Sequence, residues 1–147
     1  MPNLHTEADR QAIVARIGAL DEHTPARWGA FTAPRMVAHL SDSLRMATGD
    51  LAVASKRTVM RYSPLKQLII YVAPFPRNVP TAPELLARAP LPFGSEVRDL
   101  LRLMDRFASR DPRGPWPSHP VFGTLSGGDW GVLAYRHTDH HLRQFGA

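Results

Sequence analysis

Apolar residues recur at intervals of three and four in four separate stretches of this chain, which is the spacing of one helix face. These stretches predict helices at residues 6–22, 32–49, 95–109 and 126–145. No stretch alternates apolar and polar residues with the two-residue period of a half-buried strand. The pattern therefore predicts an all-α fold.

Residues at the ends of these stretches favour the same boundaries. Thr6 and Thr32 stand where a helix takes its N-terminal cap. Ser126 is followed three residues later by Asp129, a variant of the capping box. Gly146 occupies the usual position just beyond a helix C-terminus.

The middle of the chain, residues 51–93, contains seven prolines, which exclude one long helix there. A short helix is predicted at Ser63–Val72 within an ordered excursion. The simplest architecture is an antiparallel four-helix bundle forming one domain, residues 1–147, with this excursion between its second and third main helices. The apolar run Leu68–Phe75 is expected to pack in the core; a lid over a pocket and a contact between two copies are the alternatives.

Composition narrows the choice of function. The net charge is +5, but sixteen of the eighteen basic residues are arginines scattered singly, so no nucleic-acid-binding stripe is visible. This arginine bias is typical of a GC-rich genome, and we expect a bacterial source. No apolar run reaches the roughly 20 residues of a membrane-spanning helix, and no secretory leader is visible. We expect a cytoplasmic protein. Because the chain contains no cysteine, it has no thiol nucleophile of its own.

Histidines concentrate in the last predicted helix. His137 and His141 are four residues apart, so a helix places them on one face about 5–6 Å apart between Cβ atoms. They share that face with Trp130 and should point inward, whereas His140 lies on its flank as an alternative ligand or a supporting group. Trp130 and Trp28 are predicted to be core residues rather than pocket walls.

A metal site needs a further ligand, and His39 lies on the border of the apolar stripe of residues 32–49. Three neutral imidazoles with open positions beside them are typical of a catalytic metal site. The residues alone leave two simpler interpretations open: His39 can be a hydrogen-bonded core residue, and an HxxxH pair can lie on an exposed face. His5, His23 and His119 are expected at the surface or in loops.

Two blocks of the sequence resemble the DinB/YfiT-like superfamily of metal-binding four-helix bundles, specifically its DUF1569 branch. They run from Trp28 to Asp42 and from His119 to Gly146. That family places one ligand histidine on its second helix and an HxxxH pair on its last. The resemblance therefore implies His39, His137 and His141 as the metal ligands, and it also implies a homodimer.

Charged residues near these histidines have less definite roles. Asp42 follows His39 by one turn and is a candidate to orient it. Asp139 points away from the histidine pair and is expected to be a solvated surface residue. Arg136 and Arg143 can hold an anionic group of a substrate, although exposed arginines are the simpler interpretation.

The resemblance implies a metal-dependent enzyme with a small-molecule substrate. Related activities are S-transfer from a low-molecular-weight thiol and thiol-dependent isomerisation; hydrolysis by metal-activated water needs the same ligands. Zinc or nickel is expected, since neutral imidazoles suit both. The alternative is a non-catalytic binding protein stabilised by its metal, and a nucleic-acid-binding protein is the least favoured interpretation.

Overall fold

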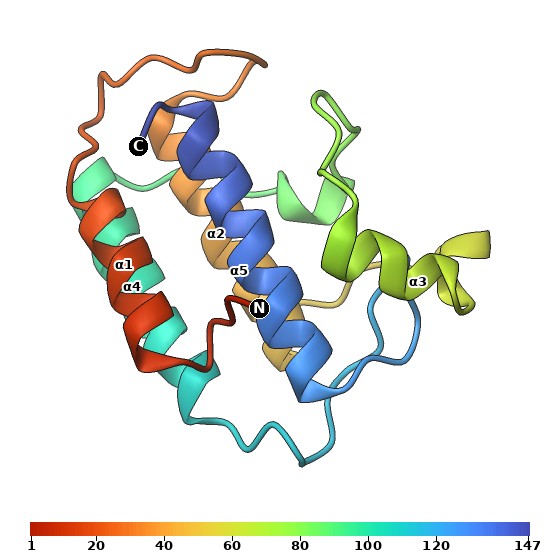
Figure 1. The fold of residues 1–147 in the computed structure, drawn as a ribbon. Helices are drawn as coiled ribbons and strands as arrows, with labels where there is room; N and C mark the ends of the chain where they lie inside the picture. Colours follow the sequence, from red (N-terminus) through yellow and green to blue (C-terminus); the bar gives the residue numbers. More distant parts are fainter.

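The structure, a computed structural model describing residues 1–147, is entirely helical, with five α-helices and no strand (Figure 1). The prediction of an all-α chain is confirmed. The helices are α1 (Glu7–Ile17), α2 (Ala33–Thr48), α3 (Leu65–Gln67), α4 (Phe93–Ser109) and α5 (Gly127–Gln144). A π-helical turn at Leu68–Val72 continues α3, and 3-10 turns lie at Val59–Arg61 and Pro83–Leu85.

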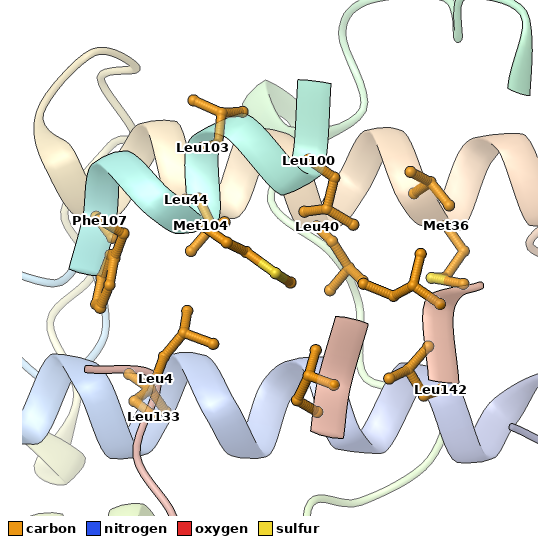
Figure 2. Close-up of a cluster of buried hydrophobic side chains, with 14 of the residues drawn as sticks. Leu4, Met36, Leu40, Leu44, Leu100, Leu103, Met104, Phe107, Leu133 and Leu142 are labelled. Atoms are coloured by element: carbon orange, nitrogen blue, oxygen red, sulfur yellow. The ribbon is translucent and has the colours of Figure 1, made fainter. Parts of the chain in front are cut away.

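The long helices pack through the apolar stripes that the sequence pattern identified. Helix α2 contacts both α4 and α5, and α1 contacts α5 and α4. Their facing side chains form one continuous core, in which Leu40, Met104 and Leu142 are almost completely buried (Figure 2). None of the helices combines the length and the apolar character that crossing a membrane requires.

Local hydrogen bonds explain where α2 and α5 begin. Thr32 Oγ1 accepts the Arg35 backbone N–H at 3.3 Å at the start of α2. At α5 the capping box is complete, because Ser126 and Asp129 each accept the other's backbone N–H. Thr6 occupies the N-cap position of α1 as predicted, but its side chain makes no capping hydrogen bond.

Helix α1 ends at Ile17, so the prediction that it continues to residue 22 is wrong. Gly18 occupies the C-cap position of α1. The chain then forms a turn around Asp21, whose side chain accepts the His23 backbone N–H at 2.7 Å. A short acidic side chain that bonds nearby backbone in this way offers an alternative to the helical hydrogen-bond ladder. The other three long helices agree with the predicted ranges to within two residues at each end.

The proline-rich excursion is fastened to the long helices by a buried cluster of charges. Arg88 lies on the excursion, and its guanidinium bonds Asp42 of α2 at 3.0 Å and Glu96 of α4 at 2.5 Å. The Glu96 side chain is fully buried. Burial opposes its charge, yet the hydrogen bonds and charge of Arg88 hold the pKa of the Glu96 carboxyl below its usual value. The cluster fixes the part of the excursion that lies closest to α2 and α4.

Candidate metal centre

Three histidines from two helices converge at one point of the interior. His39 comes from α2 and the pair His137 and His141 from α5, and α2 packs against α5 (Figure 1). One ring nitrogen from each residue can be chosen so that all three atoms lie within 4.8 Å of one another. The Nε2 atoms of His39 and His137 are 3.1 Å apart. The structure therefore brings together the three residues that the resemblance implied.

The rings meet edge to face rather than in a stack. Interplanar angles are 80° between His39 and His137, 76° between His39 and His141, and 82° between His137 and His141. Crossed rings allow nitrogen atoms to converge on a common point, which parallel stacked rings do not. Two imidazole nitrogens 3.1 Å apart, as in His39 and His137, can both bind one first-row divalent cation, whose bonds to imidazole are about 2.0–2.1 Å for zinc.

The orientation of His141 is set by Gln144, one turn further along α5. Gln144 donates from Nε2 to the Trp28 carbonyl at 2.8 Å, so its Oε1 faces His141 Nδ1 at 2.7 Å. An amide oxygen only accepts, so Nδ1 carries the proton and the Nε2 lone pair of His141 is free for a cation. This role of Gln144 was not predicted from the sequence. The signal was its position three residues after a candidate ligand.

His39 presents a polar atom that the protein does not fully satisfy. Its Nδ1 is sealed from solvent and has no hydrogen-bond partner, although the backbone of Leu85 acts to raise the pKa of this histidine. Its Nε2 faces that of His137 at 3.1 Å. Two imidazole lone pairs this close repel each other unless a proton or a cation lies between them. A cation between the facing nitrogen atoms would remove this repulsion, so the donor set fits a metal ion.

Burial keeps the three imidazoles in the neutral form that metal ligands require. Desolvation, and then the proximity of His141, lowers the pKa of His39 to about 3. Desolvation also lowers the pKa of His141 to about 4, against the opposing effect of its bond to Gln144. For His137, desolvation followed by the neighbouring histidines places the pKa well below its ordinary value. All three imidazoles are therefore uncharged at neutral pH.

A cavity of about 780 Å³ opens beside the three histidines, which form part of its wall. Most of the lining is apolar. It contains no carboxylate and a single amine, that of Lys56. Such a cavity has the size of a small-molecule site and favours apolar ligands with few charges.

Trp28 and Trp130 both border this cavity, so the prediction that they are core rather than pocket residues holds only in part. Trp130 is buried in the core, with 2% of its surface exposed, and one part of it reaches the cavity. Trp28 is half-buried and lines the cavity, with the Arg77 guanidinium 4.0 Å from its ring. The run Leu68–Phe75 likewise divides, because Ile70 is buried whereas Phe75 lines the cavity.

The remaining histidines have different surroundings. His140 lines the cavity beside Trp28 but does not belong to the converging group. His23 is exposed, as predicted. His5 lies in the turn before α1, in agreement with the prediction of a surface or loop position, although its ring packs against Phe107 and Trp116. His119 lies in a loop, as predicted, although it is half-buried and forms part of the cavity wall.

The nearby carboxylates bind arginines rather than the histidines. Asp42 accepts from Arg45 at 2.6 Å and from Arg88 at 3.0 Å, and it makes no bond to His39. Asp42 was a candidate to orient His39 but does not do so, because charged guanidinium donors form the stronger bonds with its carboxylate. Asp139 is not freely solvated either, since it pairs with Arg16 at 2.7 Å and with Arg143 at 2.9 Å.

Arg136 does not present its charge to the cavity. Its guanidinium donates to the carbonyls of Ile69, Ile70 and Ala73, at 2.9, 2.5 and 2.5 Å, and stacks over Phe75 at 4.9 Å. These are carbonyls left free at the C-terminal end of the segment that follows α3. Arg136 therefore fastens that segment to α5 and is not placed to bind a substrate anion. Arg143 remains 72% exposed, as the simpler interpretation held.

Comparison with known proteins identifies a family. No curated protein and no solved structure shows detectable similarity to the chain. One family model, described as a protein of unknown function, matches residues 3–147. The match includes the three converging histidines, the loop that holds His119 and the whole proline-rich excursion. The chain therefore belongs to the DUF1569 family.

Proposed function

We propose that this chain is a metal-dependent enzyme of the DinB/YfiT-like superfamily, built as an antiparallel four-helix bundle with a single domain at residues 1–147. In this proposal His39, His137 and His141 hold a divalent cation. The observation that carries it is the convergence of three neutral imidazole nitrogens, within 4.8 Å of one another, at the wall of a cavity of about 780 Å³.

The number of available ligands supports a catalytic site over a structural one. The converging group has three members and includes no carboxylate. Structural zinc sites are closed by four protein ligands, whereas catalytic sites have three and leave a position for substrate or water. The alternative is a non-catalytic protein stabilised by its metal. It requires a fourth protein ligand, and the converging group contains three.

The chain's own residues contribute binding and orientation. The imidazoles, kept neutral by burial, present lone pairs, and Gln144 holds His141 in the required tautomer. The apolar cavity walls bind the small-molecule substrate and exclude water. When bound, a divalent cation supplies a Lewis acid that lowers the pKa of a coordinated thiol or water.

A low-molecular-weight thiol is the co-substrate we propose, acting in S-transfer or isomerisation. The chain has no cysteine, so the thiol must come from a second molecule. Zinc and nickel are the metals we expect, because both bind neutral imidazole well. We also propose that two copies associate, as the resemblance implies.

The first test is metal binding by the purified protein. We expect titration calorimetry with Zn²⁺ or Ni²⁺ to give one site per chain. His39→Ala, His137→Ala and His141→Ala should each weaken binding at least about tenfold, since each removes one of three ligands. His23→Ala is the matched control, because His23 is exposed and lies outside the site. A wild-type protein that binds neither metal contradicts the proposal.

The same loaded protein then tests the co-substrate. Glutathione, mycothiol and bacillithiol are titrated into the metal-loaded wild type and into the metal-free protein. We expect one of them to bind the loaded form only. If none binds, the thiol-dependent activity is excluded. The metal site is tested separately, by the titration with Zn²⁺ or Ni²⁺.

A further inference from the structure

His119 stands on a short loop that the backbone holds rigid. The backbone N–H of His119 donates to the Gly123 carbonyl at 2.8 Å, and the backbone N–H of Gly123 donates to the His119 carbonyl at 2.9 Å. Gly123 has φ +69°, a conformation that favours glycine. The Pro120 carbonyl between them accepts from Arg61 at 2.9 Å and from the Lys56 backbone at 2.8 Å. The ring of His119 is therefore attached to a fixed support.

Hydrogen bonds assign the tautomer of this ring. His119 Nδ1 accepts the backbone N–H groups of Val121 at 3.0 Å and Phe122 at 3.2 Å. An atom that accepts two hydrogen bonds carries no proton, so the hydrogen of the neutral ring is on Nε2. Burial, followed by the charge of Arg61, lowers the pKa of His119 to about 4, which keeps the ring neutral at pH 7.

The Nε2–H group of this ring has no hydrogen-bond partner within the protein. The ring lies between Phe122 and Trp130, with centroid distances of 4.9 and 5.1 Å, and all three residues line the cavity. Nδ1 is directed to the loop backbone, so the opposite edge of the ring carries Nε2 away from the loop. Nε2 makes no hydrogen bond within the protein and is not among the atoms sealed from solvent.

We propose that His119 Nε2–H donates a hydrogen bond to a carbonyl oxygen of the molecule that occupies the cavity, and so selects an apolar substrate that carries an uncharged oxygen acceptor. The proposal rests on the proposed function only in taking this cavity as the substrate site. A neutral donor pairs well with a carbonyl oxygen, and among the side chains of the lining Lys56 alone could offset the charge of a carboxylate, which is costly to bury unpaired. A site built around a polar donor also discriminates against an analogue that lacks the acceptor, because the donor is then left unpaired.

Two probes of nearly equal shape test this donor. 2-Acetylnaphthalene carries a ketone oxygen, and 2-isopropenylnaphthalene has a =CH₂ group in its place. His119→Asn is the informative variant, because its amide oxygen can replace Nδ1 as the acceptor for the loop while the Nε2–H group is lost. We expect this variant to bind the ketone about five- to tenfold more weakly relative to the alkene, the effect of one hydrogen bond of about 1 kcal/mol. His23→Asn should leave the ratio of the two dissociation constants unchanged.

Nitrogen NMR of the histidine side chains gives a readout that needs no variant. In the wild type at pH 7 we expect His119 as the Nε2–H tautomer, and we expect the ketone, but not the alkene, to shift its Nε2 resonance. An Nδ1–H tautomer, a charged ring, an unchanged ratio in the folded His119→Asn protein, or failure of both probes to bind overturns the proposal. If His119→Asn does not fold, the NMR comparison of the two probes decides.

Metal titration of the same variant separates this result from the proposed function. His119 is not one of the converging ligands, so His119→Asn should bind Zn²⁺ as the wild type does. A protein that binds the ketone through His119 but takes up no metal would refute the metal-dependent enzyme and leave the assignment of His119 standing.

Discussion

At the residue scale, Gln144 shows how a neutral side chain can fix a candidate ligand. Its two amide atoms are both used, one on the Trp28 carbonyl and the other on His141 Nδ1. We expect Gln144→Ala to weaken metal binding about 10–100-fold, the usual effect of losing a group that orients a ligand imidazole. Calorimetric titration with Zn²⁺ measures the change.

A matched control exists on another helix. Gln67 is exposed on α3 and makes no side-chain hydrogen bond, so Gln67→Ala should bind Zn²⁺ with wild-type affinity. Equal affinity of Gln144→Ala and the wild type would show that packing alone orients His141.

The same scale shows how far sequence reasoning reaches. The spacing of His137 and His141 placed both on an inward face, and the family resemblance supplied His39. Their supporting partners could not be predicted in the same way, because Asp42 is near His39 in sequence but nearer to two arginines in space. Which donor a buried carboxylate binds depends on side chains that arrive from distant segments.

At the element scale, Arg136 joins the segment after α3 to α5. Replacing it with alanine leaves the carbonyls of Ile69, Ile70 and Ala73 without their charged donor. We expect Arg136→Ala to raise the rate of amide hydrogen exchange in residues 65–75 by about tenfold or more, since a hydrogen bond to a charged group contributes about 1.5–3 kcal/mol. Exchange followed by mass spectrometry localises the effect.

Arg143 provides the comparison on the same helix. It is exposed and pairs only with Asp139, so Arg143→Ala should leave exchange in residues 65–75 unaltered. Faster exchange throughout the chain in Arg136→Ala would instead mean that the substitution unfolds the whole molecule, contrary to a local fastening role.

Element boundaries were predictable where local chemistry decides them. Thr32, Ser126 and Asp129 form the capping bonds that their positions indicate. The C-terminus of α1 was not predictable from apolar spacing, because Leu20 continues the pattern past the helix end and is still buried in the core. A buried position satisfies the periodicity whether its backbone is helical or turned, so the pattern alone cannot mark the end of a helix.

At the scale of the whole molecule, the cavity is the feature that no local pattern reveals. Its wall combines Trp28, Met60, Phe75 and Phe122, which lie on loops and short turns between the long helices, with the histidines of α2 and α5. The prolines of the excursion indicated irregular structure, but where that structure runs is fixed by long-range bonds such as those of Arg88. The cavity is thus a property of the assembled chain.

Buried neutral histidines make the stability of the whole metal-free protein depend on pH. Burial is the main cause that lowers the pKa of His39, His119, His137 and His141 in the folded state. In the unfolded chain they titrate near about 6.5, so below that pH the unfolded state binds protons that the folded state does not. The free energy of unfolding should therefore fall on acidification, by up to about 1.4 kcal/mol per pH unit for each histidine, until the pH reaches the lowered pKa values.

Thermal unfolding in the presence of a chelator should show a constant Tm above pH 7.5 and a steep decrease from pH 6.5 to 4.5. His23→Ala should follow the same curve because His23 is exposed. A Tm that does not change between pH 7 and pH 5 would mean that the four buried histidines bind protons as readily in the folded protein as in the unfolded chain.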